Sequence, residues 1–206
     1  MPAGHLDGTA ATRLRFDSAT RPTLPASQTP TCPMGLGLLD ACMETSVTMS
    51  MNKPKQMSAL CVAQPWAQCI VQHGKNVENR STNLLKRGTI AIYASTNKDM
   101  KRFKYCKDNY RLSLKWDDLP KGAIIGFVDI VDVVTDETVT KKTQKWFDED
   151  YGYVLVNPIR LKKPIAAKPP KGAISFWYLK GKTLTACLRQ IPTSKLKKFK
   201  PWEALS

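Results

Sequence analysis

The sequence lacks long hydrophobic runs and any recognisable set of metal ligands. No segment approaches the roughly 20 apolar residues that a membrane-spanning helix needs, so we expect no membrane segment. Only His5 and His73 occur, and no two cysteines form a C-x-x-C pair, so there is no credible zinc site. No Ser–His–Asp constellation is present either. The composition therefore indicates a protein without a metal or another cofactor.

The cysteines show no sign of a disulfide framework. Cys61 and Cys69 lie within apolar segments, where a free thiol packs as a small hydrophobic group. Because disulfides are not indicated, a reducing compartment is the simplest interpretation. We therefore expect an intracellular protein, in the cytoplasm or the nucleus.

Acidic residues are scarce relative to basic ones. The chain has 32 Lys and Arg residues against 17 Asp and Glu residues, a formal net charge of +15. Residues 1–56 contain five basic and four acidic side chains, so almost all of the excess belongs to residues 57–206. A charge of this sign favours polyanions such as nucleic acids, although acidic proteins and membrane surfaces are attracted too.

The first 56 residues lack sustained hydrophobic periodicity and contain one aromatic residue, Phe16. Such a segment cannot bury enough apolar surface to offset its conformational entropy, so we predict a disordered low-complexity extension over residues 1–56. An organellar transit peptide is the alternative, suggested by arginines and opposed by aspartates in this segment. Those residues are Arg13, Arg15 and Arg21, and Asp7 and Asp17.

Residues 64–80 contain the most informative pattern of the chain. Pro65 suits the first position of a helix, where its missing N–H costs nothing. Trp66 and Ile70 follow at helical spacing, which predicts one buried helix face. Gly74 can adopt the left-handed conformation that ends a helix. The pattern predicts a short helix that stops at this glycine.

The strand expected after that helix carries charges where a core strand would be apolar. Asn76, Glu78 and Arg80 point to one face of such a strand, and Val77 points to the other. Lys75 lies in the turn before it. From the charges alone, the simpler interpretation is a surface ion pair worth about 0–1 kcal/mol.

The order of these segments resembles the ASCH domain, the activating-signal-cointegrator homology module of the PUA-like superfamily. The family's Q-P-W-A helix start matches residues 64–67, and residues 74–80 resemble its glycine–lysine run with a following E-x-R, here G-K-x-x-E-x-R. The R-G dipeptide with its β-rich continuation matches residues 87–95, and a second long strand matches residues 122–130. The resemblance covers residues 58–179 and depends on the ordered set of motifs.

The hydrophobic pattern and the resemblance together predict an α+β fold. We expect a small, mostly antiparallel, partly closed PUA-like β-barrel with a few flanking helices over residues 57–180. A basic helix and tail would follow over residues 181–206. The expected strands are residues 59–63, 76–80, 89–95, 123–134, 151–161 and 173–179. The expected helical segments are residues 98–108, 145–150 and 183–190, with an extended proline-rich loop over residues 162–171.

The resemblance implies binding of RNA or of a modified nucleotide in a cleft beside the first helix. Lys75 and Arg80 suit contacts with phosphate, and Glu78 can accept a hydrogen bond from an exocyclic amine. Trp66 and Tyr93 are candidate stacking faces, although Trp66 also suits the core. The candidate ligand-binding residues are Gln64, Trp66, Lys75, Glu78, Arg80, Arg87 and Tyr93.

Two other classes of function stay open. Some ASCH-like proteins resemble amidohydrolases acting on acylated cytidine nucleosides, or ribonucleases, and Lys75 and Glu78 would then be the catalytic acid–base pair. Glu78 stands where the amidohydrolase pattern has a threonine, which leaves only water activation for it. The third possibility is a module that binds a protein in a transcription or translation complex.

The basic end of the chain is a further candidate for phosphate contacts. Its lysines alternate with Phe199 and Trp202, and aromatic residues among cations can stack on bases. A solvated run of charge is the competing interpretation. The lysines concerned are Lys195, Lys197, Lys198 and Lys200.

Overall fold

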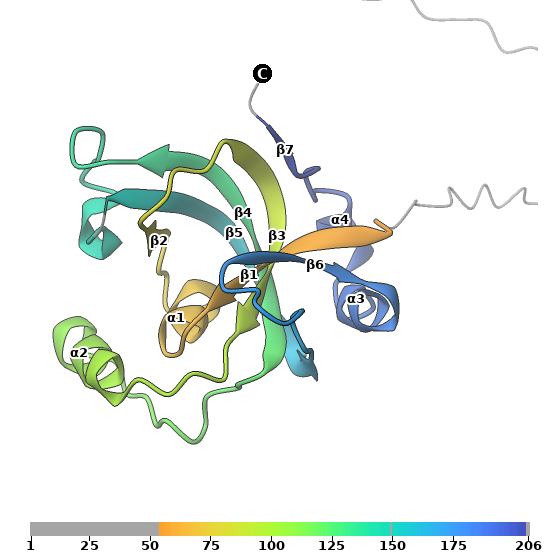
Figure 1. Ribbon diagram of the computed structural model, residues 1–206, viewed down its shortest axis with the longest axis horizontal. Helices are drawn as coiled ribbons and strands as arrows, with labels where there is room; N and C mark the ends of the chain where they lie inside the picture. The colour runs from red at the N-terminus through yellow and green to blue at the C-terminus, as the bar shows by residue number, and fades with distance from the viewer. Residues whose placement is uncertain (1–53, 149, 205–206) are drawn as a thin grey trace, which may run out of the picture. The chain divides into compact units, whose positions relative to one another are not determined.

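The computed structural model describes residues 54–148 and 150–204, which form a mixed β-sheet with helices against it (Figure 1). The extension predicted for residues 1–56 lies almost wholly outside the described residues. The strands are β1 (Gln56–Val62), β2 (Val77–Arg80), β3 (Lys86–Ala94), β4 (Ala123–Val134), β5 (Tyr151–Ala166), β6 (Phe176–Lys180) and β7 (Glu203–Ala204). The helices are α1 (Trp66–Gln72), α2 (Met100–Tyr110), η1 (Gln144–Trp146), α3 (Gly181–Leu188) and α4 (Thr193–Leu196).

The sheet is open, so the predicted barrel is wrong, whereas the α+β class is correct. Its strands are hydrogen-bonded in the order β2-β5-β4-β3-β1-β6, and β7 pairs with β3. Only β1 and β3 run parallel, so the sheet is mostly antiparallel as predicted. A closed barrel needs a ladder between its first and last strands, and within residues 54–204 none joins β2 to β6. A side chain spans the gap instead: Arg80 of β2 donates to the Cys61 carbonyl of β1 at 2.6 Å.

The predicted strand boundaries are good in the centre of the sheet and poor near the proline-rich segment. β4 has the predicted bounds, because its long apolar run is buried on both faces. β5 continues to Ala166, five residues beyond the prediction, because Ile165 and Ala166 still pair with β4. The side-chain amide of Gln190 donates to the Lys163 carbonyl and accepts from the Lys163 N–H, both at 2.8 Å. The backbone groups of Lys163 in β5 are therefore hydrogen-bonded as well. The first half of the predicted loop over residues 162–171 is therefore strand.

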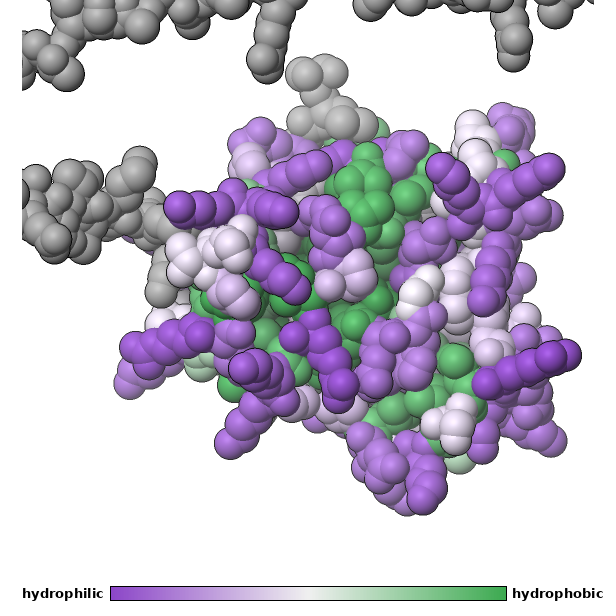
Figure 2. Space-filling view, turned by 180° about the vertical axis from the view of Figure 1, so that it is seen from behind, coloured by the Kyte–Doolittle hydropathy of each residue, from purple (hydrophilic) through white to green (hydrophobic). Residues whose placement is uncertain are grey.

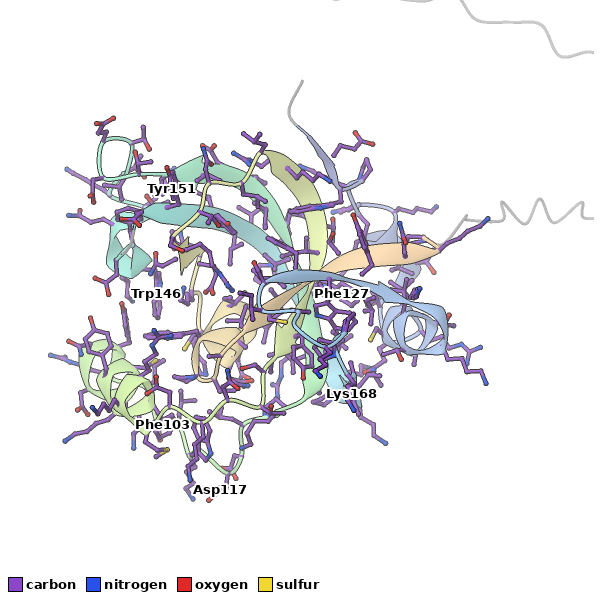
Figure 3. The ribbon with its side chains drawn as sticks, in the orientation of Figure 1. Phe103, Asp117, Phe127, Trp146, Tyr151 and Lys168 are labelled. Carbon is purple, nitrogen blue, oxygen red and sulfur yellow. The ribbon has the colours of Figure 1, made fainter. Side chains whose placement is uncertain are left out.

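Alternating residues of the strands build two hydrophobic cores on opposite faces of the sheet. Ile90 and Ile92 of β3 pack in the core that α1 covers, whereas Ala91 and Tyr93 pack in the core that α3 covers. Successive side chains of β3 therefore point to opposite faces of the sheet, as the period of a strand requires. Phe127 of β4 points to the α3 side, as Figure 3 shows.

A glycine in β4 lets α1 lie close to the sheet. A Cβ atom at Gly126 would stand 2.5 Å from the Ile159 carbonyl oxygen and 2.7 Å from a methyl group of Val71. Both distances are far below van der Waals contact, so any side chain here would push α1 or β5 away. Because α1 carries the first residues of the candidate site, Gly126 helps to set that site's geometry.

The C-terminal residues are packed against the sheet. Leu184, Cys187 and Leu188 of α3 are buried in the second core. Further on, the backbone N–H of Lys200 donates to the Thr89 hydroxyl at 2.8 Å, and the N–H of Thr89 donates to the Lys200 carbonyl at 3.1 Å. These contacts hold the end of the chain beside β3.

The Thr89 hydroxyl belongs to a buried polar group that we call the Asp129 cluster, made of Thr89, Asp129 and Asn157. The hydroxyl donates to one carboxylate oxygen of Asp129, and the Asn157 amide donates to the other at 2.9 Å. The register of β4 against β5 shifts between Phe127 and Asp129, as at a β-bulge. The cluster therefore pairs every carboxylate oxygen with a neutral donor.

The surface of the described residues is mostly hydrophilic. Figure 2, seen from behind, shows hydrophilic side chains projecting over most of that face, with hydrophobic residues visible only between them. Within residues 54–204, every helix is too short or too polar to cross a membrane.

Candidate functional site: a cleft beside α1

A cleft of about 1200 Å³ opens beside α1, between the sheet and α2. Its walls come from the ends of β1 and β3, from α1, β2, α2 and η1, and from the segment between β5 and β6. Figure 3 labels Trp146 and Lys168, which both line the cleft and lie on opposite sides of α1 in that view. The cleft therefore gathers residues from distant parts of the chain.

Gln64 anchors the helix that forms one wall of the cleft and lies outside the cleft's lining. Its side-chain oxygen accepts from the Gln68 N–H at 3.1 Å, which caps the first turn of α1. Its side-chain nitrogen donates to the Pro120 carbonyl at 2.7 Å. The residue is fully buried, so it fixes α1 against the loop before β4.

Lys75, Glu78 and Arg80 form a buried ionic group in the cleft, which we call the Glu78 cluster. Lys75 Nζ lies 3.1 Å from Glu78 Oε2, and Arg80 Nη2 lies 3.1 Å from Glu78 Oε1. The side chain of Lys75 is 4% exposed, that of Glu78 is 9% exposed and that of Arg80 is 20% exposed. The simpler interpretation as a surface ion pair is therefore wrong.

The alternation of side chains along β2 places the Glu78 cluster in the cleft, because neighbouring residues of the strand point to opposite faces. Val77 is fully buried in a core with Trp146, so the side chain of Glu78 is turned to the cleft. Lys75 also donates to the Val77 carbonyl, and its Nζ stands 5.6 Å from the centre of the Trp66 ring. Each charged group is thus held by at least two neighbours.

Two buried polar atoms of the cleft residues have no hydrogen-bond partner within the described part of the chain. They are Arg80 Nε and Ser95 Oγ. By contrast, both polar atoms of the Asn79 amide have a partner, because its nitrogen donates to the Trp146 carbonyl at 2.9 Å and its oxygen accepts from the Asp148 N–H at 3.3 Å. A buried donor without a partner costs stability, so these two atoms point to a missing partner.

Aromatic side chains form the side of the cleft next to α2, which we call the aromatic wall: Trp66, Tyr105, Tyr110 and Trp146. Tyr110 and Trp146 are stacked at 3.9 Å, and Trp66 meets both edge-on, at 6.0 and 6.5 Å. Tyr105 is 47% exposed and also meets Trp66 edge-on, at 6.4 Å. Burial, followed by the neighbouring Tyr105, raises the pKa of Tyr110 to about 12, so its phenol stays neutral.

A pair of thiols fastens α1 to α2 behind this wall. Cys69 and Cys106 are both fully buried, and their Sγ atoms are 3.6 Å apart. The hydrogen bond with Cys106, and then burial, raise the pKa of Cys69. These cysteines pack as small hydrophobic groups, as the sequence predicted for Cys69.

Of the remaining predicted residues, Tyr93 lines the cleft and Arg87 lies outside its lining. Tyr93 is nearly buried and meets the Trp177 ring edge-on at 5.9 Å, and burial raises its pKa. Arg87 is at the opposite end of β3, where its guanidinium lies 3.5 Å from Asp132 and its backbone pairs with Glu203 of β7. Its contacts there serve the attachment of the C-terminal strand.

Sequence reasoning missed most of the cleft lining, including its aromatic side next to α2. Ser95, Tyr105, Tyr110 and Trp146 all line it and were not candidates. From the sequence alone, the many lysines around Tyr105 indicate a solvated amphipathic helix, and Trp146 reads as a residue that packs inward. Two tyrosines among lysines in α2 were the one available signal, and spacing alone does not show that they meet Trp66.

The described residues hold no group of three or more His, Cys, Asp or Glu side chains arranged for a metal ion. The charged groups of the cleft are instead a mixture of cations and carboxylates. Lys75, Arg80, Arg102 and Lys168 line it against two acids, Glu78 and Asp148, so the lining is net positive.

Comparison with known proteins finds similarity to Activating signal cointegrator 1. The human protein is 28% identical over 132 residues, and the mouse protein is 28% identical over 136 residues. Each match covers 60% of this chain but only 22% of the relative, so the chain spans about a fifth of these proteins' length. The resemblance to the ASCH domain is confirmed by these relatives, at low identity.

Two further comparisons complete this result. No protein-family model matches the chain. Among solved structures, a crystal structure of a mutant ZmASCH protein from Zymomonas mobilis is 16% identical with a TM-score of 0.35, covering 64% of this chain and 93% of that one.

Proposed function

We propose that this chain, whose described part resembles an ASCH domain, binds RNA or a modified nucleotide in the cleft beside α1. The Glu78 cluster forms the floor of the binding site, and the aromatic wall stacks on a base. The single observation that carries the proposal is the meeting of these two features in one cleft. Base–aromatic stacking is worth about 1–3 kcal/mol per base, which makes such a wall an effective platform.

The charge of the cleft supports a polyanionic ligand. Its lining is net positive, and the chain as a whole carries +15. A low-dielectric cleft with cations at its floor concentrates the field on an incoming phosphate. Buried ion pairs contribute little to stability on balance, so the Glu78 cluster is better explained by binding than by folding.

The test is binding of a short single-stranded RNA, measured by fluorescence anisotropy over a series of salt concentrations. We expect binding that weakens steeply with salt, without turnover of the RNA. Replacing Tyr105 by Ala should weaken binding about 5- to 150-fold, the loss of one stacked base. Tyr178, which is 52% exposed and lies outside the cleft, provides the matched control, and Tyr178→Ala should leave affinity unchanged. Equal effects of the two variants would refute the cleft as the binding site.

Hydrolysis of an acylated cytidine nucleoside or of RNA is a second candidate. The contact of 3.1 Å between Lys75 and Glu78 inside a cleft favours it. Against it, each Glu78 oxygen already accepts from a cation, and two neighbouring cations make the carboxylate a weaker base toward water. Release of cytidine and free acid from N4-acylcytidine, lost in Glu78→Gln, would establish the enzyme.

Protein binding is a third candidate, because the curated relatives are named as signal cointegrators. In that case capture of a partner would be unaffected by Lys75→Ala and Glu78→Ala. The exposed lysines near the C-terminus suit either an acidic partner or RNA phosphates. They are Lys195, Lys197, Lys198 and Lys200.

A further inference from the structure

We propose that Arg80 and Ser95 form an oxyanion subsite on the floor of the cleft, which takes a phosphate group of the bound nucleotide. Glu78 is then a positioning residue that orients Arg80 and does not read a base edge. This inference rests on the proposed function and names the part of the ligand that occupies the floor.

The acceptors on the floor are already in use. Glu78 Oε1 accepts from Arg80 and Glu78 Oε2 accepts from Lys75, each at 3.1 Å. The Cys61 carbonyl accepts from Arg80 at 2.6 Å, and the side-chain oxygen of Asn79 accepts from the Asp148 N–H at 3.3 Å. An exocyclic amine of a base would therefore have to share each of these oxygens with a donor of the protein.

The donors on the floor are not all in use. Within the described residues, Arg80 Nε is buried without a partner, although Nη2 of the same guanidinium makes two bonds. Ser95 Oγ is also buried without a partner. Arg80 Nε can only be satisfied by an acceptor, because a guanidinium only donates, and the Ser95 hydroxyl can donate to the same acceptor group.

The two residues flank the same end of β1. Arg80 bonds the Cys61 carbonyl, and the Ser95 N–H bonds the carbonyl of the next residue, Val62, at 2.9 Å. Both side chains line the cleft. The two side chains therefore approach the cleft at the two edges of the same strand end.

Phosphate matches this arrangement better than a neutral group does. It has several acceptor oxygens and no obligatory donor, and guanidinium–phosphate hydrogen bonds are among the strong charge-assisted ones. The cluster itself is net positive, since two cations surround one carboxylate. The base of the same nucleotide can then lie on the aromatic wall.

The experiment is competition against a bound fluorescent RNA at constant ionic strength, with uridine, UMP and the dinucleotide UpU as competitors. UMP offers a terminal phosphate and UpU an internal one. Comparing them shows whether the subsite takes the phosphate at the end of a nucleotide or the phosphate within an RNA chain. We expect at least one of them to compete about tenfold better than uridine, as a charge-assisted hydrogen bond would give. Equal competition by all three would overturn the subsite.

Ser95→Ala tests the pairing of the two residues, because removing an atom without a partner leaves the fold undisturbed. In this variant, the ratio by which the phosphorylated competitor outcompetes uridine should fall at least about threefold. The melting temperature should be unchanged. Ser81→Ala is the matched control, a serine that also lines the cleft but is exposed. An unchanged advantage in Ser95→Ala, or an equal loss in Ser81→Ala, would overturn the assignment.

The outcomes separate this inference from the proposed function. RNA binding without any advantage of phosphate defeats the subsite and leaves the binding function intact. Failure of every RNA and nucleotide to bind defeats both.

Discussion

Two buried acids of the described residues look alike in sequence and act differently in the structure. Glu78 and Asp129 both lie on strands and are both nearly inaccessible to solvent. Asp129 accepts from neutral donors of Thr89 and Asn157 and is sealed by the C-terminal segment. Glu78 accepts from two cations and faces a cleft.

The comparison shows that burial of an acid does not by itself mark a functional site. The Asp129 cluster satisfies its groups internally and joins the end of the chain to the sheet. The Glu78 cluster leaves Arg80 Nε without a partner in the described residues, beside an open cleft. A group left unsatisfied next to an accessible hollow is the better indication of binding.

The largest expected effect is that of Glu78→Ala. It leaves Lys75 and Arg80 in a mostly buried position without a compensating charge, so unfolding free energy should fall by about 3–5 kcal/mol. Denaturant unfolding measures this loss, and RNA binding by the folded fraction should also weaken. A loss below about 1 kcal/mol would mean that solvent or relaxation compensates the two cations, and the cluster would then resemble a surface ion pair.

Asp129→Ala should destabilise the fold less and should leave binding intact. The hydroxyl of Thr89 and the amide of Asn157 would lose their partners, at a cost of about 1–3 kcal/mol. RNA affinity, corrected for the folded fraction, should equal that of the unchanged protein. Weakened affinity would show that the two clusters are coupled and would break the contrast between them.

Thr89→Val should loosen the C-terminal segment specifically. The variant keeps the shape of the side chain but loses its bond to Asp129 and the bond from the Lys200 N–H, at a cost of about 0.5–1.5 kcal/mol. Hydrogen exchange should be faster at Lys200 than at amides in the centre of β4. Uniform acceleration across the sheet would instead indicate a general loss of stability.

Ser95→Ala should have the smallest effect on the fold. Because Ser95 Oγ has no partner among the described residues, unfolding free energy should change by less than about 0.5 kcal/mol. Thermal unfolding checks this, and its result makes the competition experiment on the same variant interpretable. A clear destabilisation would reveal an internal partner for the hydroxyl and remove the basis for the oxyanion subsite.

Several features of the fold could be predicted because they depend on local pattern. The alternation in β3, the bounds of β4 and the end of α1 near Gly74 follow from the period of the side chains and from glycine's freedom at positive φ, here 69°. The closure of the sheet and the length of β5 could not be predicted in the same way. They depend on which distant edges pair, and side chains such as Gln190 complete that pairing.

The candidate site likewise has a part that local sequence pattern predicts and a part that depends on contacts between distant residues. The sequence by itself determined that Lys75, Glu78 and Arg80 come together, because three charged residues at the turn and on one strand face must be neighbours. Only the tertiary structure decided that they are buried, that α2 and η1 bring Tyr105, Tyr110 and Trp146 beside Trp66, and that Arg80 reaches across to β1. Those contacts join residues far apart in the chain, so they follow from how the sheet curves and packs and not from any local periodicity.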